Sequence, residues 1–425
     1  MQFGEENLWK ATLANRFEGS VAPHNDIFDV IVIGGGFTGL SAALHIALSG
    51  KTVCVLEAKT IGHGGSGRNV GYVNAGLWTP PDEVEEILGK EVGIRLNAEL
   101  ANGPETVFDL IEKHQIQCDA VRQATLHCSE TQHGLKQLQS RYDQQIARGA
   151  PVRLLDRKET CEKIGSERFV GALWDPRAGT IHPLAYAQGL ARAAHQAGAV
   201  ILEHAPAQSV RRENGRWSVN LPSGSVSAEK LIQATNAYGI EGARKNEFIP
   251  VYYFQFATEP LSDTHRRRIL AGGEGCWDCA TVMSSFRLDG EGRLLIGAVG
   301  NLNGFGGRIH KAWAKRKMAS LFPELAGVDF AYSWCGRIAF TSDHLPRVVY
   351  LGENAISIFG YSGRGISPGT VFGKCAADWV MEGSQDAFPI PIANSHHEPF
   401  IATKSLYYEF GAVATHFISN RVVGF

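Results

Sequence analysis

The sequence predicts an α/β protein, α+β overall, with two domains, one of them assembled from separate stretches of the chain. Three observations support this fold class. A short apolar strand, a glycine-rich turn, a helix and a second strand follow one another within residues 28–57. Residues 244–334 contain several strand-like runs, and a second glycine-rich segment precedes a helical pattern near residue 367. The chain has 425 residues, which is too long for one simple core.

Composition excludes several classes of partner. Lys and Arg number 41 against 43 Asp and Glu, and no basic block would follow a phosphate backbone, so no nucleic acid is expected. The N-terminus, MQFGEENLWK, is acidic and polar, and no stretch reaches the roughly 18 apolar residues of a spanning helix. A cytoplasmic protein without a transmembrane segment is therefore expected. Cys276 and Cys279 form a lone CxxC without further ligands nearby, so no metal site is predicted.

The first element is a strand–turn–helix–strand unit. FDVIVI (28–33) suits a strand buried on both faces, and Leu40 begins a helical apolar pattern after the turn. In the turn, Gly34 allows the tight bend, Gly36 lets the backbone approach a pyrophosphate, and Gly39 permits close packing of helix on strand. Glu57 ends the second strand, where an acid accepts both ribose hydroxyls of an adenosine and repels a 2′-phosphate. The unit predicts a Rossmann-like dinucleotide site that disfavours NADP.

The loop after Glu57, AKTIGHGGSGRNVGYVNAGL (58–77), is too irregular for a helix. Its GxGGSGRNxG pattern resembles the D-amino-acid oxidase-like FAD-dependent oxidoreductase superfamily, and within it the γ-glutamylputrescine oxidase and L-pipecolate oxidase branch. The resemblance continues, in order, through DPRAGTIHP (175–183), ATNAY (234–238), FATEPL (256–261), GRLLIG (292–297), TSDHLP (341–346) and GYSGRGISPG (360–369).

This resemblance implies an FAD-binding domain of the glutathione-reductase type, with FAD extended along it. The turn would hold the pyrophosphate, Glu57 the ribose, the loop after it the phosphate and ribityl side, and Ala207 the adenine through its backbone. The implied cofactor-binding residues are Gly34, Gly36, Phe37, Thr38, Gly39, Glu57, Ala58, Lys59, Ser66, Gly67, Arg68, Asn69, Val70, Gly71, Tyr72, Ala207, Thr235, Asn236, Gly363, Arg364, Gly365, Ile366 and Ser367.

The second glycine-rich segment, GYSGRGISPGTVFG (360–373), predicts a helix start. Ser367 is expected to cap the helix, with Pro368 at its first position. By the resemblance this N-terminus meets the N1 and C2 edge of the flavin, where a helix N-terminus stabilises the negative charge of the reduced ring. On local signals alone, an ordinary capped helix after a tight turn remains an alternative.

The domains follow from these placements. The FAD-binding domain is expected from residues 27–90, 150–243 and 335–385, and the β-rich substrate domain from 91–149 and 244–334. Residues 386–425 are expected to form a C-terminal tail with a helix near 406–422. The first 25 residues carry no clear prediction, and the oligomeric state is left open.

The resemblance implies oxidation of a C–N single bond in an amine or amino or imino acid: hydride moves to flavin N5, water hydrolyses the imine, and O2 reoxidises the flavin to give H2O2. Arg337 is the candidate partner of a substrate carboxylate, with a surface or flavin-contacting arginine as the alternative. Tyr252 and Tyr253 are candidates for the pocket wall, although aromatics in a strand are commonly core residues. His63 is a candidate for tuning amine protonation, or else a backbone partner.

Two departures from sarcosine oxidase-like relatives bear on the chemistry. The position of their flavin-attaching cysteine is Gly336, with Cys335 one residue away, so non-covalent FAD is expected. Their oxygen-activating lysine falls on Leu295, so O2 as the acceptor rests on the branch alone. An amine or amino-acid dehydrogenase using a quinone or protein acceptor stays open, as does a non-catalytic flavoprotein subunit of a heteromeric oxidase. No second NAD(P)-type glycine loop is found for a pyridine-nucleotide-dependent flavoenzyme.

Overall fold

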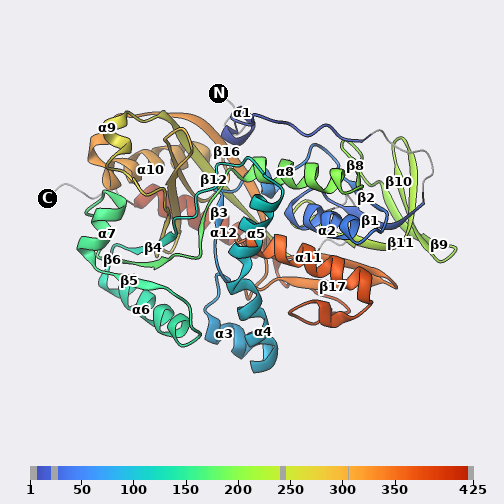
Figure 1. The fold of residues 1–425 in the computed structure, drawn as a ribbon. Coiled ribbons are helices and arrows are strands. Elements are labelled where there is room, and N and C mark those ends of the chain that lie inside the picture. The colour runs from blue at the N-terminus through green and yellow to red at the C-terminus, as the bar shows by residue number, and fades with distance from the viewer. Residues whose placement is uncertain (1–6, 21–26, 240–245, 305, 420–425) are drawn as a thin grey trace.

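The computed structural model describes residues 7–20, 27–239, 246–304 and 306–419, and two eight-stranded sheets dominate it (Figure 1). The first sheet has the order β17-β18-β11-β1-β2-β8, with β10 and β9 continuing from β11. The strands β18, β11, β1, β2 and β8 run parallel. The strands of this sheet are β1 (Ile27–Ile33), β2 (Val53–Leu56), β8 (Val200–Leu202), β9 (Ser209–Glu213), β10 (Arg216–Leu221), β11 (Gly224–Gln233), β17 (Arg347–Gly352) and β18 (Ala355–Phe359).

Both faces of this sheet are covered, which explains why β1 is apolar without alternation. Val30 and Val32 join the core beneath the helices α2 (Phe37–Leu48), α8 (Pro183–Gln196) and α11 (Ser367–Glu382). Ile31 and Ile33 point the other way and pack with residues of β10, β11 and β18. Helix α2 packs against both α8 and α11, so three segments far apart in sequence form one layer.

The second sheet has the order β16-β12-β15-β14-β13-β4-β6-β5, and its pairs are antiparallel except for β13 with β4. Its core contains Phe254, Phe256 and Phe286, packed beneath α10 (Gly306–Leu321). The strands are β4 (Thr125–Ser129), β5 (Arg153–Leu155), β6 (Gly171–Asp175), β12 (Ile249–Pro260), β13 (Gly275–Asp278), β14 (Ser284–Leu288), β15 (Arg293–Val299) and β16 (Phe330–Phe340).

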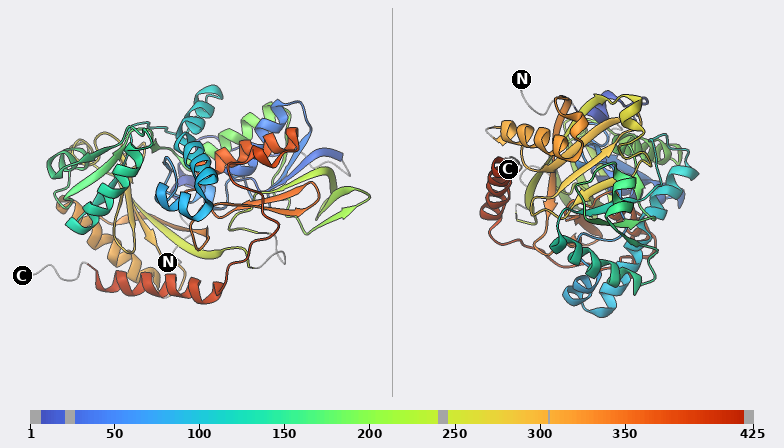
Figure 2. Two further views of the ribbon diagram at one scale, coloured as in Figure 1. Left: turned by 90° about the horizontal axis from the view of Figure 1, so that it is seen from below. Right: turned by 90° about the vertical axis from the view of Figure 1, so that its left-hand side faces the viewer.

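The remaining elements surround these sheets. A small ladder joins β3 (Tyr72–Val73) to β7 (Gly179–Thr180). The other helices are α1 (Leu8–Ala11), α3 (Pro81–Leu88), α4 (Lys90–Ala101), α5 (Gly103–Lys113), α6 (Gln132–Ile146), α7 (Arg157–Ile164), α9 (Asp263–Arg266) and α12 (Ile401–Ile418). Figure 2 shows α12 lying along the outside of the molecule, where it packs against β12 and α10.

The sheets do not follow the predicted domain limits everywhere. Strands β5 and β6 lie within 150–243, which was assigned to the first domain, but they belong to the second sheet. Strand β16 also belongs there and runs past the expected limit at 335. Helix α5, in the stretch assigned to the second domain, packs against α11 of the first. Side-chain periodicity identifies a strand or a helix face but not its partner, which long-range packing decides.

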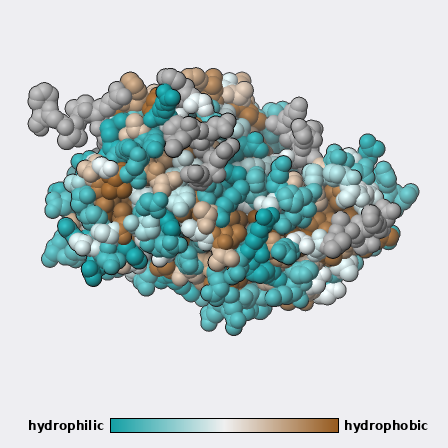
Figure 3. Space-filling model, turned by 90° about the horizontal axis from the view of Figure 1, so that it is seen from above, coloured by the Kyte–Doolittle hydropathy of each residue, from teal (hydrophilic) through white to brown (hydrophobic). Residues whose placement is uncertain are grey.

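The surface seen from above carries hydrophobic residues in separate groups among hydrophilic ones (Figure 3). Within the described parts of the chain, no helix is both long and apolar enough to cross a membrane.

Candidate active site

A cavity of about 1350 Å³ extends between the two sheets. Residues of the first sheet's loops line one part of it, and residues of β12, β13, β14, β15, β16 and α12 line another. Cavities for drug-sized ligands measure about 300–1,000 Å³, so this one has room for a larger group or for two ligands.

Most of the residues predicted to bind the cofactor line this cavity. They are Gly34, Gly36, Phe37, Thr38, Glu57, Ala58, Lys59, Ser66, Arg68, Asn69, Val70, Tyr72, Ala207, Thr235, Asn236, Gly363, Arg364, Gly365 and Ile366. Gly39, Gly67, Gly71 and Ser367 do not line it. Gly39 and Gly67 instead allow close packing, because a Cβ on either would overlap the carbonyl oxygen of Gly34 or of Gly62.

The glycine turn presents the start of α2 to the cavity. Gly34 has φ of +114°, and a Cβ there would lie 2.7 Å from the carbonyl oxygen of Ala234. Gly36 is the N-cap and has no capping side chain, so amide groups of the first turn other than that of Phe37 remain available to an anion. The Phe37 amide donates to Ser66 Oγ at 3.2 Å, which links the turn to the following loop.

Glu57 lies at the end of β2 with its carboxylate held by the backbone. Its two oxygens accept hydrogen bonds from the amides of Gly35 and Lys59, at 2.8 and 2.9 Å. Burial raises the pKa of Glu57, and these amide hydrogen bonds oppose that rise by stabilising the carboxylate. The carboxylate therefore has a fixed position beside the first turn of α2.

The loop after Glu57 is held by its own polar side chains. Arg68 donates from Nε to the carbonyl of His63 at 2.8 Å and from Nη1 to that of Cys335 at 3.3 Å. Asn69 donates to the carbonyls of Gly65 and Ser66 and accepts from the Gly71 amide. The hydrogen bond from Arg68 to Cys335 thus fastens the loop to β16.

The N-terminal segment supports this loop, which the sequence did not indicate. Asn7 donates to the carbonyl of Gly67, and Trp9 Nε1 to that of Asn69, both at 2.8 Å. Trp334 of β16 donates to the carbonyl of Arg68 at 2.9 Å. Trp9 is almost completely buried, so an N-terminal segment for which the sequence carried no clear prediction packs against the loop that lines the cavity.

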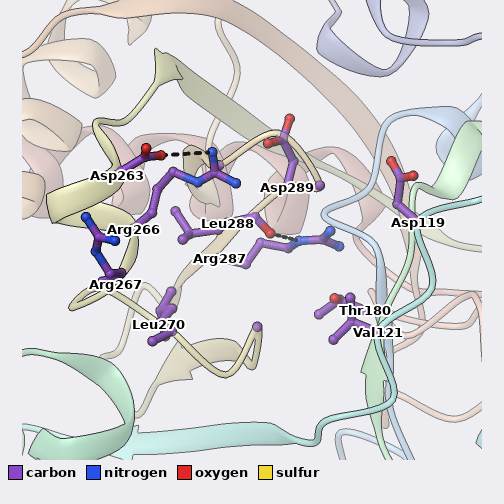
Figure 4. Close-up of a pocket in the computed structure, with 14 residues that line it drawn as sticks. Asp119, Val121, Thr180, Asp263, Arg266, Arg267, Leu270, Arg287, Leu288 and Asp289 are labelled. Carbon is purple, nitrogen blue, oxygen red and sulfur yellow. Dashed lines mark hydrogen bonds and ion pairs between the residues drawn. The ribbon is translucent and has the colours of Figure 1, made fainter.

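A smaller cavity of about 350 Å³ lies behind the same loop (Figure 4). The fully buried Arg287 guanidinium donates to the carbonyls of Val70, Gly71 and Ile181. Gly71 has φ of +88° and packs against Ile181, so Arg287 and Gly71 together fix the approach of the chain to β3.

The prediction that Ser367 caps α11 was wrong. The helix includes Ser367, its N-cap is Ile366, and the Gly369 and Thr370 amides already bond to the carbonyls of Gly365 and Ile366. Ser367 is therefore already helical, and its hydroxyl is buried without a hydrogen-bond partner. Residues Gly363 to Ile366 still line the cavity, and Asn236 accepts a hydrogen bond from the Gly360 amide at 3.0 Å.

Comparison with known proteins identifies the family. The model of the "FAD dependent oxidoreductase" family, DAO, matches residues 29–379. The chain belongs to this family. It is 31% identical to a probable oxidoreductase OrdL of Rhizobium meliloti over 89% of each chain, and 30% identical to γ-glutamylputrescine oxidoreductase of Escherichia coli over 92% of each. The crystal structure of glycine oxidase from Geobacillus kaustophilus superposes with a TM-score of 0.72 at 22% identity, covering 88% of this chain and 99% of that one.

As a DAO-family member the chain is an FAD-dependent oxidoreductase, and its cavity fits the cofactor. The uncapped start of α2 suits a pyrophosphate, and a Cβ on Gly36 would lie 2.9 Å from Ser66 Oγ, where it would narrow the space before that helix. The volume exceeds that expected for a drug-sized ligand.

Of the predicted substrate residues of this DAO-family enzyme, some line the cavity and one does not. Tyr253 lines the cavity and donates to Ser285 Oγ at 2.9 Å. Its neighbour Tyr252 does not line the cavity, because successive side chains of a strand point to opposite faces. His63 lines the cavity, and burial together with Arg68, Lys10 and Lys59 lowers its pKa to about 4. The imidazole is therefore neutral near pH 7.

Arg337 also lines the cavity but is engaged by Tyr238. Its guanidinium lies 5.0 Å from the centre of the Tyr238 ring, and its amide donates to the Tyr238 hydroxyl at 2.9 Å. Its Nε is buried without a hydrogen-bond partner. A Cβ on Gly65 would lie 3.7 Å from the Arg337 carbonyl, so this residue sits beside the loop that follows Glu57.

A second arginine at the cavity has no carboxylate partner in the described part of the chain. Arg364 donates to the carbonyl of Ala75 at 3.0 Å, and its guanidinium lies 5.7 and 5.4 Å from the ring centres of Trp78 and Trp277. Burial, followed by the charge of Arg141, lowers the pKa of Arg364 to about 9. The sequence predicts Arg364 as a cofactor-binding residue of the second glycine segment and gives no sign that its side chain faces two tryptophans.

Asp175 is the acid whose charge acts on the pKa of Arg364, but it is paired with another arginine. Asp175 binds Arg177 through two hydrogen bonds, at 2.9 and 2.6 Å. Trp277, which lines the same part of the cavity, has a buried indole Nε1 without an acceptor. This end of the cavity therefore offers unpaired donors and a positive charge between aromatic walls.

Proposed function

We propose that this enzyme oxidises the C–N bond of an amine or amino or imino acid. Its similarity to γ-glutamylputrescine oxidoreductase and glycine oxidase supports a substrate with an amine nitrogen. The observation that carries the proposal is a single cavity with a dinucleotide-type glycine turn on one part and the unpaired Arg364 guanidinium between two tryptophans on another.

The cofactor would be held by the backbone at one end and by fixed side chains at the other. The turn from Gly34 to Thr38 would hold the pyrophosphate, and Glu57 the adenosine ribose. The loop residues Ser66 to Tyr72 and the segment Gly363 to Ile366 would lie beside the ribityl chain and the ring. Ala207, Thr235 and Asn236 would complete the adenine side. The argument rests on their common position along one cavity.

FAD, when bound, supplies the oxidising group that accepts two electrons and a hydrogen from the carbon next to nitrogen. The chain's part is to orient that carbon and keep the amine neutral. Trp78, Trp277 and Tyr253 exclude water from the substrate end, and low polarity favours an unprotonated amine. His63, neutral near pH 7, can accept a hydrogen bond from the loop side of the cavity. Water then hydrolyses the imine product.

Arg364 is the better partner for a substrate carboxylate than Arg337. Arg337 lies beside the loop that follows Glu57, where the cofactor is proposed to bind. Arg364 instead lies between Trp78 and Trp277, and the buried Trp277 Nε1 offers a second donor at the same end of the cavity. A carboxylate would supply both the missing negative charge and acceptors for the guanidinium, and such bidentate pairs are among the strong hydrogen bonds.

Non-covalent FAD and O2 as the acceptor complete the proposal. Cys335, the cysteine nearest the attachment position of sarcosine oxidase-like relatives, packs against the second sheet's core and does not line the cavity. Leu295 is fully buried with Trp9 and Trp334 and does not line the cavity, so the proposal of O2 rests on the similarity to oxidases such as glycine oxidase. A dehydrogenase that passes electrons to a quinone or protein is the second candidate.

Anaerobic bleaching of the yellow protein tests these proposals. The panel would contain L-pipecolate, sarcosine, glycine, D-proline, D-alanine and γ-glutamylputrescine, followed by admission of air. We expect one class of compound to bleach the flavin, with colour and H2O2 returning in air. Slow recovery in air would instead indicate the dehydrogenase, and no bleaching by any amine would refute C–N oxidation.

A further inference from the structure

Helix α12 lines the cavity although it lies outside the segment that the family model matches. That match ends at residue 379, whereas α12 spans Ile401–Ile418. Five residues of α12 line the cavity: Tyr407, Tyr408, Gly411, Ala412 and Thr415. Figure 1 and Figure 2 show this helix returning from the first sheet to lie beside the second. The wall it forms therefore lies outside the matched segment.

The helix is anchored on both sides of its cavity-lining residues. Near its start, Ser405 Oγ donates to the carbonyl of Pro250 at 2.8 Å, and Lys404 Nζ to Ser342 Oγ at 2.7 Å. Near its end, His416 Nδ1 lies 2.8 Å from His310 Nδ1, and the His416 ring stacks on Trp313 at 4.1 Å. A wall held this way keeps its position when a ligand binds.

Gly411 is an unusual residue for the position it occupies. It lies inside an 18-residue helix, where glycine is less favourable than alanine because it loses more backbone freedom. Its φ is not positive, and a Cβ added to it would meet no other atom within 4 Å. Neither backbone strain nor close packing explains the glycine. The open space beside it is the cavity.

We propose that α12 selects the substrate by size and that Gly411 leaves room for an uncharged substituent of the amine. The surrounding cavity residues Phe340, Tyr408 and Thr415 are uncharged and partly apolar, so an alkyl or aryl group suits this wall better than a second charge. This inference rests on the proposed function, since the group selected belongs to an amine or amino acid oxidised in the same cavity.

The test compares Gly411→Leu with Ala414→Leu in the FAD-loaded protein. Ala414 is exposed and does not line the cavity, so Ala414→Leu adds the same side chain to the same helix outside the cavity wall. Acetate carries a methyl group on its carboxylate, and anthranilate carries an uncharged aminophenyl ring. Binding of each is measured from the change in the visible spectrum of bound FAD. We expect Gly411→Leu to weaken anthranilate binding about 10–200-fold, as for a group that no longer fits a pocket, and acetate less than about twofold. Ala414→Leu should change neither.

A parallel experiment measures KM and kcat for sarcosine and N-benzylglycine. Gly411→Leu should raise KM for N-benzylglycine selectively, and Gly411→Ala should do so less while keeping or raising Tm. Equal effects on small and large ligands, no effect of Gly411→Leu, or no anthranilate binding by the unaltered enzyme would overturn the inference. If no amine bleaches the flavin but the anthranilate difference persists, the proposed reaction fails and the size selection stands.

Discussion

Replacing Arg364 with methionine should make the protein more stable and weaken its binding of a carboxylate ligand. The guanidinium is buried between Trp78 and Trp277, with one backbone acceptor and no carboxylate among the described residues. Burial lowers its pKa to about 9, so the charged form is disfavoured in the folded protein and the cost is fully present at pH 7. Methionine keeps much of the side-chain volume and removes the charge.

The size of both effects follows from this environment. Because one pKa unit corresponds to about 1.4 kcal/mol, this lowered pKa sets an upper limit of about 5 kcal/mol on the stability gained by Arg364→Met. Against this, a charged hydrogen bond contributes about 1.5–3 kcal/mol, so losing it should weaken a carboxylate ligand about 10–150-fold. Opposite signs for stability and binding are expected of a residue retained for function.

Two measurements on one variant test this reasoning. Thermal unfolding of the FAD-loaded protein should show a higher Tm for Arg364→Met, and titration with anthranilate should show the larger dissociation constant. Arg337→Met provides the matched control, since that arginine lines the same cavity but lies beside the loop that follows Glu57. A lower Tm together with unchanged anthranilate binding would show that Arg364 is a structural residue.

Further predictions concern the cofactor and the C-terminal helix. Gly39→Ala places a methyl group against the Gly34 carbonyl, so it should lower the free energy of unfolding by about 1–3 kcal/mol and weaken FAD binding, measured by titrating the apoprotein. The control is Gly50→Ala, which is strained at φ of +84° but free of contacts; it should lower Tm and leave FAD affinity unchanged. Trp9→Phe removes the hydrogen bond to the Asn69 carbonyl and should weaken FAD binding by up to about tenfold; unchanged affinity would show that the N-terminal segment does not support the loop. Burial lowers the pKa of His310 to about 4 and of His416 to about 3, so below pH 6.5 the unfolded chain binds protons that the folded chain does not. Stability should therefore fall as the pH drops from about 6.5 toward 4. The double variant His310→Phe/His416→Phe should flatten that part of the profile of Tm against pH, and an unchanged profile would show that these two histidines do not cause the loss of stability.

The elements that the sequence predicted are those that depend on residues close together in the chain. The strand, glycine turn, helix and acid from Phe28 to Glu57 depend on contacts within about thirty residues, where backbone freedom and apolar spacing are readable directly. The second glycine segment was found for the same reason, although its cap was misplaced by one residue because the helix begins on the carbonyls of Gly365 and Ile366.

Only the tertiary structure showed which distant segments of the chain contact one another. Nothing in their spacing announced that Trp9 would support the loop before β3, that β5 and β6 would join the second sheet, or that α12 would line the cavity. Arg364 was recognised as a residue of the cofactor segment, but its unpaired charge follows from Trp78, Trp277 and the Asp175–Arg177 pair, which come from other elements. Sequence patterns report a residue's own conformation and the side on which it is buried, whereas the counter-charges and walls around it depend on which distant segments pack beside it.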